Sequence, residues 1–369
     1  MFTIHKDAEG ENVEIVYQTE TEVFLRQELR DTTCWWFYWS FHADNLPKEK
    51  VAFNFCNREV VGPFGPAVSL DGENWEWLGA KSSPDRKTFT YSNTAGHKRV
   101  YFALSHCYRS INLKRFIDKH KKNPLFNASV LTVSEKGADI PIFTIGKQGA
   151  ERHIFLTARH HACEATGSYV LEGFIEQLFS AGNGILKNHK IHVVPFIDYD
   201  GVIAGDQGKR RAPHDHNRDY EGDSIYASVR AVKALADNYG GKIAAAFDFH
   251  SPWLWGGDND TAHILRAENR PDGALRFFEI MRARYGAAGE SGQIPFDGRN
   301  DVGTGEKRNS SELNLSMFIG YMNYKKVPLA LLTETPYFGT PDTFTVTPEN
   351  MRGLGRRYAL ALEDYFKHG

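Results

Sequence analysis

Cysteine is scarce in this chain and long hydrophobic runs are missing. The two absences argue against a disulfide-stabilised protein and against a membrane-spanning one. The 369 residues include four cysteines, which are widely scattered and form no C-x-x-C pair: Cys34, Cys56, Cys107 and Cys163. This spacing favours free thiols in a reducing compartment over a disulfide framework. The N-terminal residues contain no apolar signal-peptide core, and no later run is long enough to cross a bilayer. We therefore expect a soluble, cytoplasmic protein with no membrane partner.

A strong excess of charge of either sign is also absent. The formal net charge is -2 and the sequence pI is near 6.7. Such a balance gives no broad electrostatic attraction to nucleic acid, so we expect no nucleic-acid partner. Aromatic residues make up 13% of the chain, which is typical of an ordered globular protein rather than a disordered one.

The N-terminal part contains short alternating or aromatic runs that are separated by turn signals. These runs cover residues 12–18, 22–28, 34–43, 50–57 and 98–106. Short strands at such spacing are typical of an all-β unit. We predict a small β-sandwich domain over residues 1–120, and residues 111–130 form the junction to the rest.

After about residue 135 the pattern changes to buried strands that alternate with helices. Four compact apolar runs stand out, at residues 153–158, 190–197, 242–249 and 327–334. Helical periodicity follows or separates them, at residues 169–179 and 225–235 and, after a Thr-Pro-Glu start, at residues 347–367. This alternation predicts an α/β domain over residues 121–369, with a mixed, mostly parallel sheet flanked by helices.

Polar side chains collect where the four apolar runs end. They are His160, His161 and Glu164 after the first run, Asp198 and Asp200 after the second, Asp248 and His250 at the third, and Glu334 at the fourth. In open α/β sheets, ligands bind at the carboxyl ends of the strands. The sequence therefore predicts a functional site at this edge of the sheet.

Three of these side chains can form a zinc site. Catalytic Zn²⁺ takes three ligands from histidine and carboxylate and keeps a fourth position for water. His161 and Glu164 lie three positions apart across a turn into a helix, and His250 can complete the triad from another strand. A His-x-x-Glu pattern alone is common by chance, so the prediction of a zinc site depends on the further polar residues at the other strand ends. His160, one position earlier on a strand end, should point away as a packing or rim residue.

Four ordered signatures resemble those of the zinc metallocarboxypeptidases, and within them the cytosolic carboxypeptidase group with its bacterial members. The first is Arg-x-His-x-x-Glu at residues 159–164, and the second is the pair Asn217-Arg218. The third is a strand that ends in His250-Ser251, and the last is Glu334 ahead of a short segment that ends in glycine. The N-terminal β unit looks like the extra sandwich domain of that group.

The resemblance implies a zinc-dependent carboxypeptidase that removes the C-terminal residue of a peptide. It implies one Zn²⁺ per chain, held by His161, Glu164 and His250. Glu334 is then the general base that activates water. Arg218, with Asn217 beside it, would hold the terminal carboxylate of a peptide or another small carboxylate-bearing substrate.

The resemblance also implies an arginine that stabilises the oxyanion. The stretch Lys209-Arg210-Arg211 offers candidates, of which Arg211 is favoured and Arg210 is the alternative. The tyrosine that closes over substrate stays open between Tyr321 and Tyr324.

Two other functions remain open from the sequence. A zinc-dependent amidohydrolase or deacylase that acts on N-acyl amino acids or other small amides would need the same metal ligands. A non-catalytic binding module is the other alternative, although the intact set of metal ligands and Glu334 argue against it.

Overall fold

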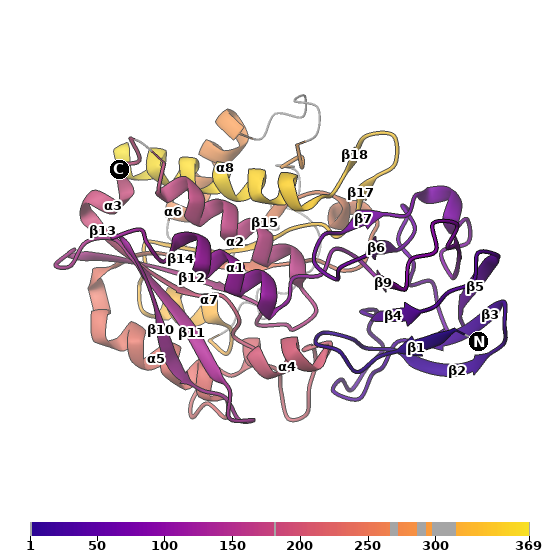
Figure 1. The fold of residues 1–369 in the computed structure, drawn as a ribbon. Helices are drawn as coiled ribbons and strands as arrows, with labels where there is room; N and C mark the ends of the chain where they lie inside the picture. Colours follow the sequence, from indigo (N-terminus) through magenta and orange to yellow (C-terminus); the bar gives the residue numbers. More distant parts are fainter. Residues whose placement is uncertain (1, 181, 266–271, 286–292, 297–314, 369) are drawn as a thin grey trace.

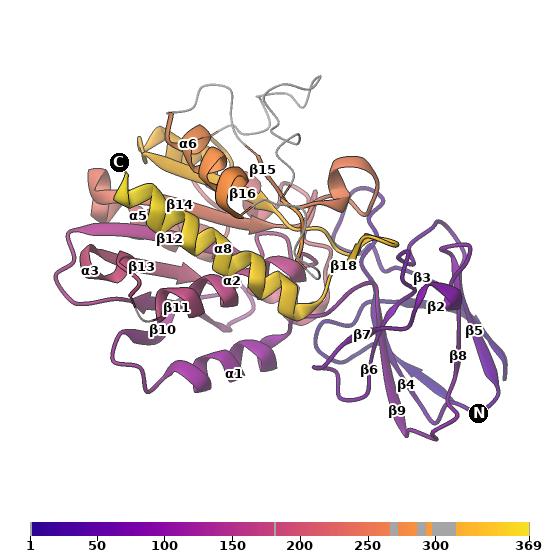
Figure 2. The ribbon, with the colours of Figure 1, turned by 90° about the horizontal axis from the view of Figure 1, so that it is seen from above.

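The computed structural model describes the chain except for residues 1, 181, 266–271, 286–292, 297–314 and 369. Two units lie end to end (Figures 1 and 2), a β-sandwich that contains the N-terminus and an α/β unit that contains the C-terminus. No helix in the described ranges is both long enough and apolar enough to cross a bilayer.

The N-terminal unit is a sandwich of two sheets around an aromatic core. One sheet has the order β1 (Thr3–His5), β4 (Ser40–Asp44), β9 (Arg99–Ala103), β6 (Ala67–Ser69) and β7 (Glu76–Trp77). The other has the order β2 (Glu14–Gln18), β3 (Glu22–Arg26), β5 (Lys50–Phe55) and β8 (Thr88–Ser92). Alternate residues of β5 are buried, as expected for a strand with one face on a core. The predicted sandwich is confirmed, although the aromatic run over residues 34–43 becomes a strand only from Ser40.

A seven-stranded sheet forms the centre of the α/β unit. Its order is β10 (Phe126–Val133), β11 (Asp139–Ile145), β13 (His189–Val194), β12 (Arg152–Ala158), β14 (Ile243–His250), β16 (Leu329–Glu334) and β15 (His263–Leu265). The four apolar runs of the sequence are the central strands β13, β12, β14 and β16, and each pairs in parallel with its neighbour. Strands β11 and β15 pair antiparallel to this group, so the predicted mixed, mostly parallel sheet is confirmed.

Helices cover both faces of this sheet. They are α1 (Ser110–His120), α2 (Ala165–Leu178), α3 (Ile185–Asn188), α4 (Tyr199–Ala204), α5 (Ala227–Tyr239), α6 (Asp272–Ile280), α7 (Phe318–Tyr324) and α8 (Pro348–Lys367). Thr347 caps α8 through the backbone N–H of Asn350. Helices α2 and α8 lie side by side (Figure 2), and Gly173 and Gly355 permit this because a Cβ atom at either would lie within 2.0 Å of the other helix's backbone oxygen.

The predicted junction over residues 111–130 is regular structure. It contains most of α1 and the start of β10. Leu113 and Phe116 of α1 are buried in the hydrophobic core of the α/β unit. Helix α1 thus packs with the second unit, and the division at residue 120 stays a prediction.

The carboxyl edge of the sheet faces the sandwich. Cys163, Leu254 and Tyr337 each come shortly after a central strand of the sheet, and all three are buried in the sandwich's hydrophobic core. This packing seals the two units together around the place where the polar strand ends meet. The site predicted from sequence therefore lies next to the interface between the units.

Hydrogen bonds from the sandwich hold the loop 205–211. The side chain of Gln207 accepts from the backbone N–H of Tyr38 and donates to its carbonyl oxygen, both at 2.9 Å. The Asp31 carboxylate accepts from the backbone N–H groups of Gln207 and Gly208 at 3.0 and 2.8 Å. Backbone groups with such partners lose their freedom to move, so the sandwich fixes the path of this loop.

A buried histidine between the units makes stability depend on pH. His106 is 1% exposed and lies edge-on against Trp77 at 4.6 Å between ring centroids. Burial lowers the pKa of His106 to about 3 from its usual 6.5. The unfolded chain therefore takes up a proton below pH 6.5 that the folded protein excludes, and stability falls as the pH falls from 6.5 towards 3.

We expect the substitution His106→Phe to make this pH dependence shallower. It removes the titrating group and keeps an aromatic edge against Trp77. At pH 5 one such histidine lowers the free energy of unfolding by about 2 kcal/mol relative to neutral pH. Urea unfolding at several pH values between 7 and 5 measures the difference. His368→Phe, at an exposed position, serves as the control, and an unchanged pH slope in His106→Phe would contradict the assignment.

Candidate metal centre

His161, Glu164 and His250 come together at the carboxyl edge of the sheet. The Nδ1 atoms of the two histidines are 3.1 Å apart. Glu164 places Oε1 at 3.0 Å from His161 Nδ1 and Oε2 at 2.6 Å from His250 Nδ1. One donor atom from each of the three residues lies within 4.8 Å of the others, and all three side chains are buried. The structure thus brings together the three ligands predicted from the sequence.

The turn that carries His161 and Glu164 is held by Arg159. Strand β12 ends at Ala158, and Arg159 takes a left-handed conformation with φ of 59°. Its Nε donates to the Ala162 carbonyl at 2.9 Å and its Nη1 donates to the Tyr108 carbonyl at 3.0 Å. A buried guanidinium needs such acceptors, and here they fix the turn that leads into α2.

Strand register places His250 and Glu334 side by side. His250 is the last residue of β14 and Glu334 is the last residue of β16. The two residues are direct partners in the parallel pairing of these strands. Glu334 is 9% exposed and lies close enough to Lys209 to help raise the pKa of that lysine.

Each histidine of the cluster has a carboxylate behind it. Asp248 Oδ2 is 2.6 Å from His250 Nε2, and Asp215 Oδ1 is 3.6 Å from His161 Nε2. His250 can therefore donate its Nε2–H to Asp248 and present Nδ1 to the cluster, whereas Asp215 lies near His161 Nε2 at a distance longer than a hydrogen bond. Metal-binding histidines commonly donate their other N–H to a carboxylate in this way, because it fixes the tautomer and the ring orientation.

His160 lies next to the cluster, with its ring 5.8 Å from the His250 ring. Its Nδ1 is 2.7 Å from Asp248 Oδ1 and its Nε2 is 2.8 Å from the Tyr220 hydroxyl. The Asp248 carboxylate thus joins His160 to His250. His160 is fully buried, so of the two expected roles the structure fits packing rather than a rim position, and the side chain lies beside His250 rather than pointing away from it.

The charges of the cluster favour a bound cation. Burial raises the pKa of Glu164, but His161, Lys209 and His250 outweigh it and hold the pKa well below its usual value. Burial lowers the pKa of His250, but Asp248 and Glu164 raise it to about 10. A positive charge between two buried carboxylates is thus strongly stabilised. Two imidazole nitrogens and a carboxylate are also a donor set that suits Zn²⁺.

Lys209 reaches the cluster, a contact that sequence patterns alone did not single out. Its Nζ is 2.7 Å from Glu164 Oε1, and it also lies 5.1 Å from the centre of the Trp36 ring. The side chain is 19% exposed. A tryptophan of the sandwich and a carboxylate of the α/β unit therefore hold this ammonium group between them.

Arg211 lies in a separate cluster of carboxylates. Its guanidinium is 2.8 Å from Asp198, 2.9 Å from Asp206 and 3.1 Å from Asp31. The structure does not bring it into contact with His161, Glu164 or His250 in the described part of the chain. Arg210, the alternative, is exposed and donates its backbone N–H to Asp215.

The pair Asn217-Arg218 lies beside the cluster. The Asn217 amide is buried, with Nδ2 at 3.2 Å from His250 Nε2 and Oδ1 accepting the backbone N–H of Phe318. Arg218 is exposed, and its Nη1 donates to the Asn217 carbonyl. The arginine is therefore open to a ligand, whereas the asparagine is engaged within the protein.

Tyr321 and Tyr324 are the two candidates for the tyrosine that closes over substrate. Tyr321 donates its hydroxyl to Asp237, and Tyr324 is 69% exposed.

Burial raises the pKa of the Cys163 thiol to about 12, and its Sγ lies 4.0 Å from the Tyr337 hydroxyl. Among the described residues, Cys163 is not one of those whose donor atoms gather at the cluster.

Two cavities lie between the units. One of about 390 Å³ is lined by Trp35, Trp253 and Trp255 together with Arg58 and Lys87. Because Trp253 packs against Trp36, which lies over Lys209, this cavity is close to the cluster.

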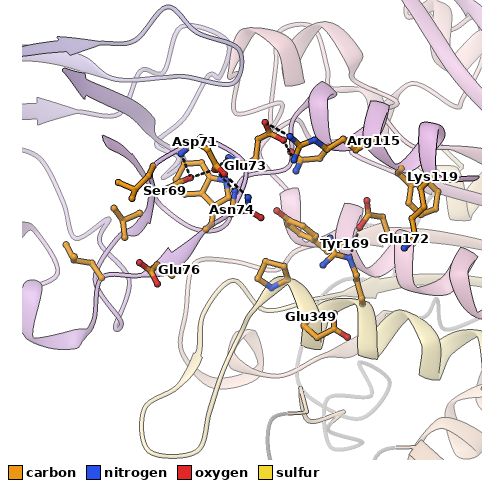
Figure 3. Close-up of a pocket in the computed structure, with 18 of the residues that line it drawn as sticks. Ser69, Asp71, Glu73, Asn74, Glu76, Arg115, Lys119, Tyr169, Glu172 and Glu349 are labelled. Atoms are coloured by element: carbon orange, nitrogen blue, oxygen red, sulfur yellow. Dashed lines mark hydrogen bonds and ion pairs between the residues drawn. The ribbon is translucent and has the colours of Figure 1, made fainter. Parts of the chain in front are cut away.

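The other cavity, of about 860 Å³, lies between the sandwich and the helices α1, α2 and α8 (Figure 3). Charged side chains on its wall pair with each other. Glu73 pairs with Arg115 across the two units, and Glu172 pairs with Arg352 at 2.7 Å. The residues that line it do not include the three members of the His161 cluster.

Comparison with known proteins finds a family similar to part of the α/β unit. Residues 113–262 match the profile of the zinc carboxypeptidase family. The matched range contains His161, Glu164 and His250 and ends before Glu334. This part of the chain is therefore similar to the zinc carboxypeptidases, a family of peptidase hydrolases.

Within this class, the curated relatives are cytosolic carboxypeptidases, and the resemblance seen in the sequence is confirmed. Cytosolic carboxypeptidase 6 of Caenorhabditis elegans is 26% identical over 262 residues, which cover 62% of this chain and 56% of the relative. Cytosolic carboxypeptidase 2 of Danio rerio is 29% identical over 282 residues, which cover 64% of this chain and 38% of the relative. The chain thus spans about half or less of the length of these relatives.

Solved bacterial structures share the whole two-unit fold. A metallo-carboxypeptidase from Burkholderia cenocepacia superposes with a TM-score of 0.80 at 17% identity and covers 100% of this chain and 99% of its own. A metallo-carboxypeptidase from Pseudomonas aeruginosa gives 0.80 at 18% identity, with 99% of both chains covered. The sandwich and the α/β unit therefore occur together in other proteins.

The two adjacent histidines should differ in their effect on metal content. We expect His161→Ala to lose the zinc ion of this cluster, because it removes a ligand. His160→Ala should keep zinc but bind it 10- to 100-fold more weakly, since it removes only the group that orients Asp248. Metal analysis of the purified variants, followed by competition with a chelator, measures both effects. A zinc content and affinity in His161→Ala unchanged from the wild type would contradict the assignment of this residue.

Proposed function

We propose that this protein is a zinc-dependent carboxypeptidase that removes the C-terminal residue from peptides. The observation that carries the proposal is the buried cluster of His161, Glu164 and His250, with Glu334 as the strand partner of His250. We propose one zinc ion in this cluster. The curated relatives are named cytosolic carboxypeptidases, and we propose a cytoplasmic location here as well.

Zinc bound by these residues would polarise the scissile carbonyl and lower the pKa of a water molecule. Glu334 accepts a proton from the attacking water and later donates it to the leaving amine. His160 and Asp248 keep the His250 ring in place throughout. The Trp36 ring shields Lys209 from solvent on the sandwich side.

Arg218 selects the chain end. Its guanidinium is exposed beside the cluster and can bind a carboxylate through two parallel hydrogen bonds. Asn217 holds Arg218 through its backbone carbonyl and contacts His250 through its amide. The solved Pseudomonas aeruginosa structure is in complex with (2-guanidinoethylmercapto)succinic acid, a carboxylate-bearing molecule, which supports a ligand of this chemistry.

Lys209, rather than Arg211, supplies the cation that faces the reacting carbonyl. Arg211 is occupied by Asp31, Asp198 and Asp206. Lys209 contacts Glu164, and the nearby Glu334 carboxylate helps to raise the pKa of the lysine. Its ammonium group can therefore stabilise the negative charge that develops on the carbonyl oxygen during the reaction.

The substitution Glu334→Gln tests the proposed function. We expect kcat on C-terminal peptide substrates to fall about 10²- to 10⁴-fold, because the amide cannot accept the proton of water. Zinc content should stay at the wild-type level, since Glu334 is not a ligand. Peptide hydrolysis, followed by release of the terminal amino acid, measures kcat. Glu221→Gln, at an exposed carboxylate, is the control, and an unchanged kcat in Glu334→Gln would refute the mechanism.

Substitutions of adjacent cations test the role of Lys209. We expect Lys209→Met to lower kcat about 10²- to 10³-fold, whereas Lys209→Arg should restore part of the rate because it keeps the charge. Arg210→Met, one position on and exposed, should behave like the wild type. Steady-state kinetics on proteins of verified zinc content separate this effect from loss of metal. A wild-type kcat in Lys209→Met would exclude the lysine from the reaction.

A further inference from the structure

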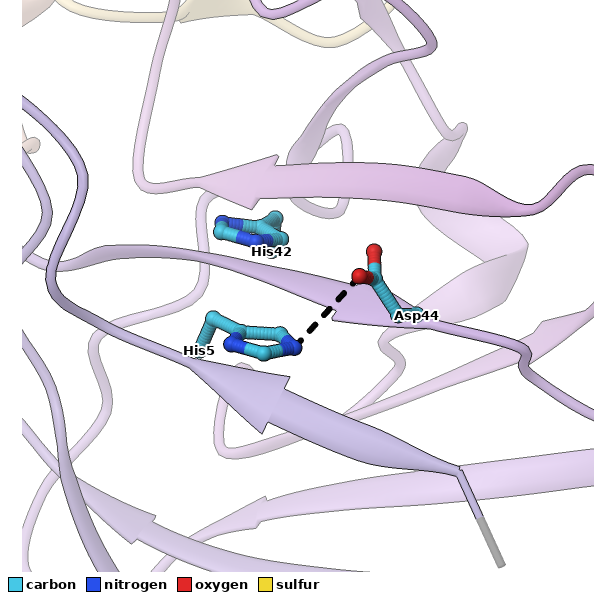
Figure 4. A group of neighbouring side chains, drawn as sticks. All are labelled: His5, His42 and Asp44. Carbon is cyan, nitrogen blue, oxygen red and sulfur yellow. Dashed lines mark ion pairs between the residues drawn. The ribbon is translucent and has the colours of Figure 1, made fainter.

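A second group of metal-ligating side chains lies in the sandwich. It consists of His5 on β1 and of His42 and Asp44 on β4 (Figure 4). One nitrogen from each imidazole and one oxygen of Asp44 all lie within 4.8 Å of one another. These residues belong to the N-terminal unit, whereas the cluster of His161 belongs to the α/β unit.

Strand register brings the three donors to one face. His5 and His42 are direct partners in the antiparallel pairing of β1 and β4. Asp44 is two positions after His42, and residues at this spacing point to the same face of a strand. His5 Nε2 is 3.4 Å from Asp44 Oδ2. Ligand atoms around a tetrahedral zinc ion with bonds of about 2.0 Å are about 3.3 Å apart, so this pair already has the required spacing.

A buried carboxylate orients the His42 ring. Glu11 Oε1 is 2.6 Å from His42 Nδ1, and the two residues are 2% and 6% exposed. The carboxylate accepts the Nδ1–H, which leaves the lone pair on Nε2. Such a carboxylate–histidine pair is the usual support of a metal-binding imidazole. The rings of His5 and His42 are stacked at 4.6 Å with an angle of 8° between their planes, so the half-exposed His5 ring has to turn out of the stack before both imidazoles can direct a nitrogen lone pair at one ion.

Asp44 is fixed from its other side by Arg99. The guanidinium donates to Oδ1 at 2.7 Å and to Oδ2 at 2.8 Å. A carboxylate oxygen has two lone pairs, so Oδ2 can accept from Arg99 and bind a second cation. His5 is 38% exposed at its side chain, which gives an ion access from solvent.

We propose that His5, His42 and Asp44 form a second metal site, which binds a divalent first-row transition metal ion such as zinc. Two imidazoles and one carboxylate suit zinc, nickel or copper, whereas calcium and magnesium prefer a set of oxygen ligands. The site does not depend on the proposed carboxypeptidase activity. The protein then binds two zinc ions per chain, one in each unit. The ion in the sandwich ties the edge strand β1 to β4.

Four forms of the full-length protein test the site: wild type, His5→Ala, His161→Ala and the double variant. Each is loaded with zinc, dialysed and analysed for metal per chain. We expect two, one, one and no zinc ions, respectively. His5→Ala should retain wild-type peptide hydrolysis, because His5 is outside the proposed active site. Cobalt provides a second readout, since visible absorption bands in the His161→Ala protein should disappear in the double variant.

Matched controls exclude loss of structure. Thr3→Ala lies two positions from His5 on the same strand face and should bind two zinc ions. His5→Gln keeps a polar side chain and should behave like His5→Ala, and thermal unfolding without metal should be equal among these proteins. The proposal is overturned if His5→Ala binds as much zinc as the wild type, or if His161→Ala binds none. If the His161 cluster binds no zinc, the metal content of His161→Ala will equal that of the wild type. A lower metal content in His5→Ala would still show that the second site binds zinc.

Discussion

The ion pairs of Arg211 hold the two units and the loop beside the metal cluster in one arrangement. Its guanidinium contacts Asp31 of the sandwich, Asp198 after β13 and Asp206 of the loop itself. Burial raises the pKa of Asp198 and of Asp206, so both carboxylates depend on the arginine for compensation. Without it, three carboxylates would face each other at the interface, at a cost of several kcal/mol. The position of Lys209, two residues away, follows from this arrangement.

The sequence was sufficient to predict the central strands and the three residues of the His161 cluster. The strands depend on local information, since a compact apolar run marks a buried strand. The three residues were singled out together with partners farther along the chain, because the local His-x-x-Glu pattern is common by chance. Parallel strands carry their last residues to one edge, so His250 and Glu334 could be expected together before their register was known. The turn of Arg159 and the start of α2 follow from contacts within a few residues.

The partners that come from distant parts of the chain could not be predicted. Arg211 and Asp31 are 180 positions apart, and no periodicity relates them. Because three cations lie next to each other in the sequence, only the three-dimensional contacts show that Lys209 faces the cluster and Arg211 faces the interface. The same holds for His160, whose burial depends on Asp248 and Tyr220 from other strands and loops.

The contacts of the sandwich with the loop 205–211 also bear on the order of folding during synthesis. Asp31 and Tyr38 are made well before Gln207 and Gly208, which they bind. Domains generally fold as units, the N-terminal one first while the chain is still growing. The sandwich strands therefore precede the loop in synthesis, whereas the core of the sandwich is complete only after Cys163, Leu254 and Tyr337 have been added.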